Sequence, residues 1–142
     1  MTVAEIVHAR GHRNVRSTHT TTLEVTRETE LTERGSCIIA VAADKGAADL
    51  SAELKEALRR EEARVTVTVE CGGLQDSVRA RGSPRLSFTH PTDLVVRRSG
   101  YVCGRTVAIL ADRAASDLSR RLVDKLRDPS QRVKVIFAVE TH

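Results

Sequence analysis

Short stretches in which apolar and polar residues alternate recur along the chain, and this period of two predicts β-strands. In residues 65–70, three valines alternate with two threonines and a glutamate. The continuously apolar stretch Cys37–Ala43 instead indicates a strand that is covered on both faces. Strands are predicted in this way at Val3–Arg10, Thr22–Thr26, Cys37–Ala43, Val65–Val69, Ser77–Arg81, Asp93–Arg97, Thr106–Ala111 and Val133–Glu140.

Two further stretches have their apolar residues at helical spacing, three or four residues apart. The first begins near Ala47 and carries charged residues on its opposite side. The second runs from about Ala114 to Leu126, and Pro129 ends it because proline has no backbone N–H to donate. The apolar stripes consist of Ala47, Leu50, Leu54, Ala57 and Leu58 in the first helix and Leu118, Leu122 and Leu126 in the second.

The two helical stretches belong to an internal repeat. Residues 43–58 match residues 111–126 at a constant offset of 68, with eight identities in sixteen positions. Upstream, Val7–Gly11 and the Thr18-His19 pair match Val78–Gly82 and the Thr89-His90 pair at an offset of 71. Such self-similarity predicts repeated structural units. We therefore expect a single domain made of two repeats, about 1–71 and 72–142, that share one core.

Each repeat would have one helix for about four strands, which leaves a sheet face and strand edges uncovered until the repeats pack together. We therefore predict an internally duplicated α+β fold with two helices and a pseudo-two-fold axis, in which the sheet is mainly antiparallel or barrel-like. Two alternatives remain open at this level. The repeats could form separate side-by-side sheets, or the strands that flank each helix could pair in parallel, because a helical crossover permits it.

The composition favours a soluble globular protein, since 40% of the 142 residues are hydrophobic and 30% are charged. Aromatic residues make up only 2%, so Val, Leu, Ile and Ala must build the core. No apolar stretch is long enough for a membrane helix, and no secretory signal is recognisable, so we expect a cytoplasmic protein without a membrane partner. Cys37, Cys71 and Cys103 show no CxxC spacing and are predicted to be small buried thiols.

The formal net charge is +4 and the sequence pI is about 9.3, which favours anionic ligands. Arginines surround the two repeated glycine loops, as a solvated basic surface or as a concave site for phosphate or carboxylate. Nucleic acid is a further partner to consider, but the few aromatic residues are scattered, so binding would involve the phosphate backbone. The arginines concerned are Arg10, Arg13, Arg16, Arg79, Arg81 and Arg85, with Arg97 and Arg98 as a further pair.

Residues that recur in both repeats are the candidates for a site between them. Thr18-His19 and Thr89-His90 each precede a predicted strand. Histidine can donate, accept or change its charge near neutral pH, so two copies across a two-fold axis could converge on one ligand. The alternative is structural, with each Thr-His pair forming a side-chain-to-backbone turn that starts the next strand.

Asp44-Lys45 and Asp112-Arg113 recur where an apolar strand leads into a helix. The aspartates could cap the helix N-terminus by accepting bonds from its free N–H groups. Alternatively, they could hold a metal or a ligand hydroxyl, while the neighbouring cations hold an anion at the helix start.

The two glycine loops differ at one position, where the first repeat has His12 and the second has Ser83. A metal site of His12, His19 and His90 with an aspartate would suit zinc or iron, but no HxH or HExxH spacing supports one. Phosphate-loop, dinucleotide-binding and nucleophile-elbow glycine patterns are absent, so no cofactor or reaction is predicted. The ligand-binding candidates are His12, Thr18, His19, Thr89, His90, Asp44, Lys45, Asp112, Arg113, Arg10 and Arg81.

Four segments are distinctive: ARGH at 9–12, LTERGSCIIAVAADK at 31–45, THPTDLVVRRS at 89–99 and ADRAASDL at 111–118. They resemble an archaeal family, domain of unknown function 371, over nearly the whole chain. The resemblance implies an archaeal cytoplasmic protein and brings no established activity. In that family the two loops read Gly-His-Pro-Asn and Gly-His-Pro, whereas this chain has Gly11-His12-Arg13-Asn14 and Gly82-Ser83-Pro84, which argues against a symmetric pair of loop histidines.

Three hypotheses about function follow. The first is a small-molecule anion site between the two repeats, with or without catalysis, for a ligand that bears phosphate or carboxylate. The second is a module that binds the nucleic-acid backbone. The third is a structural or assembly protein that forms a homodimer through a free strand edge.

Overall fold

The computed structural model describes all 142 residues, from Met1 to His142. It contains eight β-strands, two α-helices and a 3-10 turn before each helix. In chain order the elements are β1 (Thr2–Arg10), β2 (Thr22–Thr26), β3 (Ile38–Ala40), a 3-10 turn (Ala47–Asp49), α1 (Ala52–Leu58), β4 (Arg64–Cys71), β5 (Leu74–Arg81), β6 (Asp93–Arg97), β7 (Thr106–Ala108), a second 3-10 turn (Ala115–Asp117), α2 (Arg120–Leu126) and β8 (Arg132–Glu140).

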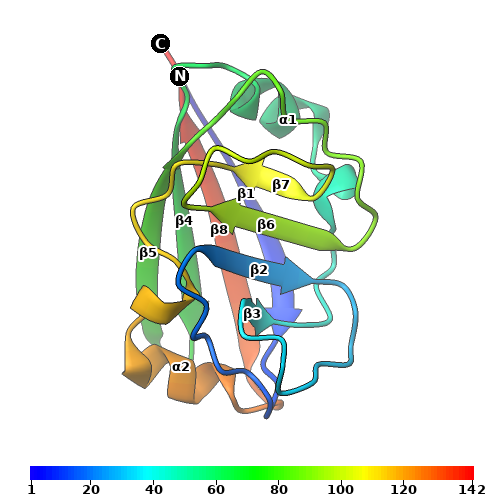
Figure 1. Ribbon diagram of the computed structural model, residues 1–142, viewed down its shortest axis with the longest axis vertical. Helices are drawn as coiled ribbons and strands as arrows, with labels where there is room; N and C mark the ends of the chain where they lie inside the picture. Colours follow the sequence, from blue (N-terminus) through cyan, green and yellow to red (C-terminus); the bar gives the residue numbers. More distant parts are fainter.

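The strands form two four-stranded sheets. The larger sheet has the order β1–β8–β4–β5 and is antiparallel throughout. The smaller sheet has the order β3–β2–β6–β7, with an antiparallel β2–β6 pair at its centre and parallel pairs on either side. The sheets are stacked face to face and their strands cross at a wide angle (Figure 1). The fold is therefore α+β and mainly antiparallel, as predicted, and it is not closed into a barrel.

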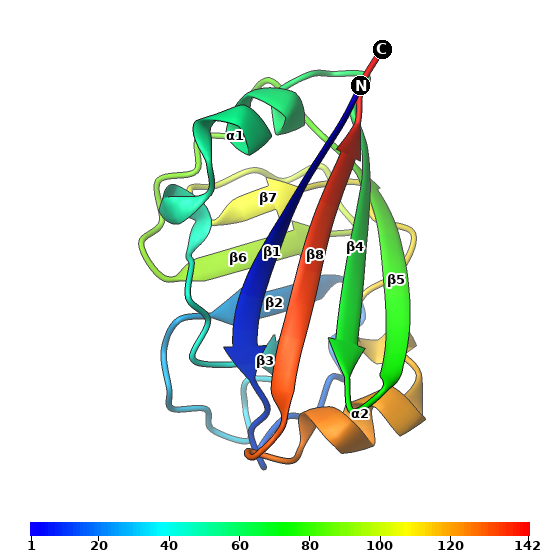
Figure 2. The same ribbon diagram turned by 180° about the vertical axis from the view of Figure 1, so that it is seen from behind.

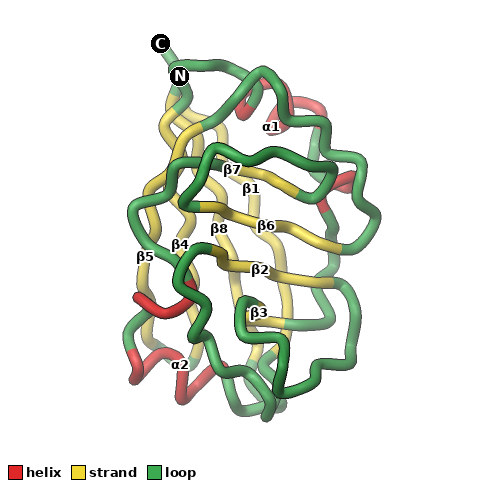
Figure 3. The backbone as a smooth tube through the Cα atoms, in the orientation of Figure 1, coloured by secondary structure: helices red, strands yellow, loops and turns green.

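Neither helix covers the outer face of the larger sheet. The helices α1 and α2 lie at opposite ends of the stack, as the red segments of Figure 3 show. Figure 2 looks onto the larger sheet from outside, and no other part of the chain lies in front of its four strands. The outward side chains of this sheet are thus free to meet a partner.

One hydrophobic core of 39 buried residues lies between the sheets and draws on both halves of the chain. It forms because alternate residues of each strand in the larger sheet point inward. In β8, for example, Val133, Val135, Phe137 and Val139 are buried, whereas Arg132 and Lys134 are exposed. Alanine, valine and leucine dominate this core, as the low aromatic content requires.

Two predicted strands are shorter than their apolar patterns indicate. The stretch Cys37–Ala43 is paired in the sheet only over Ile38–Ala40, because Ala42 has a φ of 52° and turns the chain away. Leu110 has a φ of 54° and follows β7 in the same way. Ala43 and Ala111, which follow these two turns, are nevertheless buried, so loop packing as well as sheet pairing buries the two stretches.

The helices are also shorter than predicted. Their apolar stripes begin in the 3-10 turns, but the chain becomes extended at Leu50 and Leu118, with ψ of 149° and 145°. Ser51 then caps α1 by accepting a 3.1 Å hydrogen bond from the Leu54 N–H.

The two alternative arrangements of the strands do not occur. The strands that flank each helix, β3 with β4 and β7 with β8, lie in different sheets, so the predicted parallel pairing between them is wrong. Separate side-by-side sheets are also wrong, because each sheet contains strands from both halves of the chain. The parallel pairs that do form, β2–β3 and β6–β7, are connected by loops rather than by a helix.

Corresponding residues of the two halves face one another at the centre of each sheet. In the larger sheet Thr68 pairs with Ile136, at the sequence offset of 68, and in the smaller sheet Glu24 pairs with Val95, at the offset of 71. Both members of a directly opposed antiparallel pair point to the same side of the sheet. An approximate two-fold axis therefore runs perpendicular to both sheets between these pairs. That the chain arose by internal duplication, with a boundary near residues 71 and 72, stays a prediction.

Candidate functional site

The two glycine loops have a structural task at the ends of the helices. A Cβ atom on Gly11 would lie 2.2 Å from the carbonyl oxygen of Asp128, and one on Gly82 would lie 2.2 Å from that of Leu58. The His12 N–H donates to the Leu126 carbonyl at the end of α2. Each loop thus packs against the helix of the other half, and glycine is needed for the close approach.

His12 and Ser83 do the same local work despite their different chemistry. The Nδ1 atom of His12 accepts a 3.0 Å bond from the Asn14 N–H. The Oγ atom of Ser83 accepts a 3.2 Å bond from the Arg85 N–H. Each side chain therefore accepts a bond from the backbone N–H two residues further along the chain and stabilises the same local turn. The two loops do not differ in this contact.

The Thr-His pairs start the strands that follow them. Nδ1 of His19 accepts a 3.1 Å bond from the Thr22 N–H, and Nδ1 of His90 accepts a 3.0 Å bond from the Asp93 N–H. The structural alternative for these pairs is thus confirmed. Thr18 precedes His19 and is exposed, as is Thr89 before His90.

The two histidines do not converge. Thr22, which follows His19, pairs with Arg97, whereas Asp93, which follows His90, pairs with Thr26. The histidines therefore lie at opposite ends of the β2–β6 pair, whose ends are roughly 13 Å apart at the usual rise per residue. A single small ligand held by both imidazoles is incompatible with this separation.

Asp44 and Asp112 cover the edges of the larger sheet. Oδ1 of Asp44 accepts a 3.0 Å bond from the His8 N–H on β1, and Oδ1 of Asp112 accepts a 2.9 Å bond from the Arg79 N–H on β5. The prediction that these aspartates cap the helices is wrong, because the chain turns sharply before the helix and brings them beside the edge strands. Satisfying a free edge N–H in this way protects the sheet from pairing with another chain.

Lys45 and Arg113 are paired with carboxylates of the chain. Nζ of Lys45 lies 3.0 Å from Glu5, and Arg113 makes a bidentate contact with Asp76, in which the Nη2 to Oδ2 distance is 2.8 Å. The hydrogen bonds from Arg113 lower the pKa of Asp76, although partial burial opposes the shift. These two cations are therefore already engaged in ion pairs.

Other cations have no such partner, and they share the outer face of the larger sheet. Six arginine and lysine side chains point outward from this sheet. None of these six forms a salt bridge, and all are exposed. Glu70 and Glu140 are the acidic side chains that point outward on the same strands, so the outward side chains of these strands have a formal charge of +4. Asp44 adds a negative charge beside Arg10 and Arg132. The basic face, as we call it, consists of Arg10, Arg64, Arg79, Arg81, Arg132 and Lys134, with His8 beside them.

The basic face has two corners that correspond through the approximate two-fold axis. Arg64, Arg79 and Arg81 line a hollow of about 390 Å³ at the first corner, together with Glu140. At the second corner, the corresponding residues Arg132, His8 and Arg10 line a hollow of about 280 Å³ together with Asp44. Lys134 and Glu70 line an adjoining hollow of similar size. Of the predicted site residues, Arg81 thus lines the first hollow, and Arg10 and Asp44 line the second.

The smaller sheet carries a charged group that sequence reasoning missed. Glu24 is buried at the approximate axis, with its Oε1 atom 3.6 Å from Arg105, and the same guanidinium lies 3.2 Å from Asp93. Burial, together with the charge of Asp93, raises the pKa of Glu24 to about 7 despite Arg105. The available signal was an acidic residue within an apolar strand, between Leu23 and Val25.

The cysteines differ from one another more than predicted. Cys71 is buried, whereas Cys37 and Cys103 are partly exposed. Although burial opposes it, bonding from the Arg105 backbone, Thr106 and Arg97 lowers the pKa of Cys103 to about 7, and the Arg97 Nη2 atom lies 3.4 Å from Sγ. Burial and the neighbouring Glu24 raise the pKa of Cys37 to about 11.

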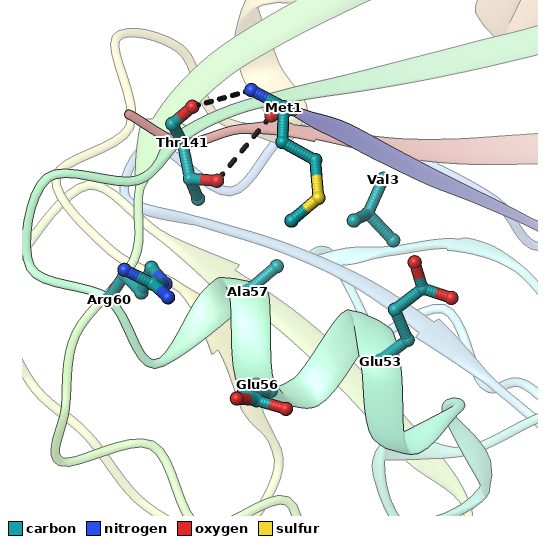
Figure 4. Close-up of a pocket in the computed structure, with 7 residues that line it drawn as sticks. All are labelled: Met1, Val3, Glu53, Glu56, Ala57, Arg60 and Thr141. Carbon is teal, nitrogen blue, oxygen red and sulfur yellow. Dashed lines mark hydrogen bonds between the residues drawn. The ribbon is translucent and has the colours of Figure 1, made fainter.

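A separate hollow lies where the two ends of the chain meet. Figure 4 shows it between Met1, Thr141 and the side of α1 that carries Ala57, and the Met1 amino group donates a 2.8 Å bond to the Thr141 carbonyl. Its volume is about 110 Å³. Ligand pockets usually have about 300 Å³ or more, so this hollow is too small to be the main site.

The three histidines considered as metal ligands, His12, His19 and His90, each bond to the backbone of a separate loop. No three His, Cys, Asp or Glu side chains are grouped in a way that would hold a metal ion. None of the helices has the length and apolar character needed to cross a membrane.

Fold and surface together define an α+β protein of two stacked sheets, whose larger sheet presents an uncovered basic face. A family model described as domain of unknown function (DUF371) matches residues 7–140. An uncharacterized protein of Methanocaldococcus jannaschii is 45% identical over 123 residues, which cover 87% of this chain and 90% of that protein. The chain therefore belongs to this archaeal family, as its segments implied, and neither comparison names an activity.

Proposed function

We propose that the basic face binds the phosphate backbone of nucleic acid. The observation that carries the proposal is the presence of six exposed cations without carboxylate partners on one uncovered sheet face. Unpaired arginines are suited to phosphate because their planar guanidinium groups donate two parallel hydrogen bonds. Four strands with a common core hold these side chains at fixed positions.

The chemistry of the face favours binding without base recognition. It presents no Phe, Tyr or Trp side chain on which a base could stack, and its outward residues besides the charged ones and His8 include Ala4, Ile6, Thr66, Thr68 and Ala138. Affinity would come from the release of counterions. For duplex DNA, log K falls against log salt concentration with a slope of roughly 0.9 for each phosphate that is neutralised. Six contacts correspond to a slope of about 5.

The earlier hypothesis of a small-anion site between the repeats has less support. Lys45 and Arg113 are engaged with Glu5 and Asp76, and His19 and His90 lie at opposite ends of a strand pair. Arg10 and Arg81 keep their predicted role as anion-binding residues, but as members of the basic face. The ligand is thus still anionic, but it is larger than a small molecule and lies on the outer face of the larger sheet.

The test is fluorescence anisotropy with a labelled oligonucleotide at several salt concentrations. Between about 50 and 200 mM salt, six phosphate contacts should weaken binding about a thousandfold. The control variant replaces three exposed, unpaired arginines away from the basic face, Arg34→Gln, Arg121→Gln and Arg127→Gln, and changes the net charge equally. Equal loss of affinity in this control and in Arg64→Gln, Arg79→Gln, Arg81→Gln would refute the assignment to the basic face.

A further inference from the structure

We infer that the partner is double-stranded DNA and that the two corners of the basic face contact its opposite strands. This inference rests on the proposed function and adds the form of the nucleic acid and the way it is bound. It follows from the symmetry, spacing and chemistry of the two corners.

The symmetry of the face matches that of a duplex. The approximate axis passes between Thr68 and Ile136, perpendicular to the larger sheet, and relates Arg64 to Arg132. The backbones of a DNA duplex are likewise related by two-fold axes perpendicular to the helix, which is why two-fold proteins bind palindromic sites. With the two axes aligned, each corner meets one strand in the same orientation.

The spacing of the corners fits two backbones that border one groove. Arg132 lies eight residues from Glu140, which pairs with Arg64, so the outermost cations are roughly 27 Å apart along the strands. Arg79 and Lys134 are the nearest cations across the axis, separated by four residues and two strands, or roughly 16 Å. The major groove of B-form DNA is about 12 Å wide between its backbones, and each phosphate adds its own radius. The distance between phosphates across the groove therefore falls in the range between the nearest and the outermost cations.

The middle of the face is compatible with lying over a groove. The central row contains Ile6, Ile136, Thr68 and Ser77, which carry no charge and therefore neither attract nor repel a backbone. Two other forms of nucleic acid fit less well. A-form RNA has a narrow, deep major groove, and single strands are usually held by aromatic stacking that this face does not offer.

The experiment compares one sequence as duplex DNA, duplex RNA and single-stranded DNA, each about two helical turns long. Duplex DNA should bind at least about tenfold more tightly than the other two at equal salt. A duplex of about six base pairs spans only about 20 Å at 3.4 Å per pair, which is less than the roughly 27 Å between the outermost cations, so it should lose part of the salt dependence.

Corner variants test whether both strands are contacted. Arg64→Gln, Arg79→Gln, Arg81→Gln removes the first corner, and Arg10→Gln, Arg132→Gln, Lys134→Gln removes the second. Each should reduce the salt slope by about half, and the combined variant should remove it. Because these side chains are exposed and unpaired, circular dichroism and thermal melting of the variants should match the unmodified protein.

The outcomes separate this inference from the proposed function. If no nucleic acid binds at low salt, both fail. If single and double strands bind equally, or if one corner variant alone removes all binding, the proposed function stands and the two-strand arrangement fails. Tighter binding to duplex RNA than to duplex DNA would overturn the assignment to DNA.

Discussion

Glu24 and Val95 are direct partners in the β2–β6 pair and hold corresponding positions in the two halves, yet one is a buried acid and the other is apolar. The residue that contacts Glu24, Arg105, corresponds to Cys37 in the other half, at the offset of 68. The approximate symmetry is therefore broken where the axis crosses the smaller sheet. Within this asymmetric group, the pKa of Glu24 is raised to about 7, so Glu24 changes its charge near neutral pH.

Glu24 should make the protein less stable as the pH rises. The folded state keeps the Glu24 proton up to a pH of about 7, whereas the unfolded chain releases it near the ordinary glutamate pKa of 4.5. Folding therefore opposes ionisation, and stability should fall between pH 4.5 and about 7. Glu24→Gln should remove this part of the pH dependence and should be more stable than the unmodified protein at pH 8, by about 3 kcal/mol. If the melting temperatures of the two proteins changed with pH in the same way across this range, the assignment would be contradicted.

Cys103 should be the reactive thiol. With a pKa of about 7 it is largely thiolate at slightly alkaline pH, while Cys37, with a pKa of about 11, is not. Iodoacetamide should therefore modify Cys103 at least about tenfold faster, with a midpoint near pH 7, and peptide mass spectrometry would separate the two sites. Arg97→Met should shift the midpoint upward, because the guanidinium stabilises the thiolate. Equal rates at the two cysteines would show that this environment does not activate Cys103.

Gly11→Ala should destabilise the protein by at least about 2 kcal/mol, because the new methyl group would meet the Asp128 carbonyl oxygen at 2.2 Å. The matched control is Gly100→Ala, whose nearest contact would be a Leu110 side-chain atom at 3.9 Å. Urea unfolding measures both. Similar midpoints for the two variants would mean that the loop moves away from the helix without cost.

His19→Ala and His90→Ala should each lower stability by about 1 kcal/mol, since each removes acceptors for backbone N–H groups at a strand start. Neither change should alter nucleic-acid binding, because both histidines lie outside the basic face. Thermal melting combined with anisotropy tests both statements. A large loss of binding with unchanged stability would restore these histidines as ligand-binding residues.

Much of the secondary structure could be predicted because the period of apolar residues is a local property. The ranges Thr22–Thr26 and Asp93–Arg97 agree with the observed strands at both ends. For β5, which ends at Arg81, the pattern predicts a start at Ser77, but the strand begins at Leu74. Its early residues pair with β4 through the turn at Gly72 and Gly73, both with positive φ, and the irregular burial of this part gave no clean alternation.

The candidate site was predicted less well, because local neighbours do not decide a side chain's partner. Lys45 stands next to Asp44 in the sequence, but its carboxylate partner is Glu5, on a strand that begins the chain. The two Thr-His pairs recur faithfully, yet the recurrence reflects a turn that both halves need. A repeated residue can thus indicate repeated structure without indicating a shared ligand.

The sequence by itself determined the order of strands and helices, the likeness of the two halves, the basic charge and the family, since all of these are written in local periods and residue identities. Only the tertiary structure decided which cations are free. Arg113 is neutralised once β5 places Asp76 beside it, whereas Arg10, Arg64 and Arg132 meet on one face through the register of β1, β4 and β8. That register joins strands up to 138 positions apart, from Thr2 to Glu140, and packing in the common core selects it.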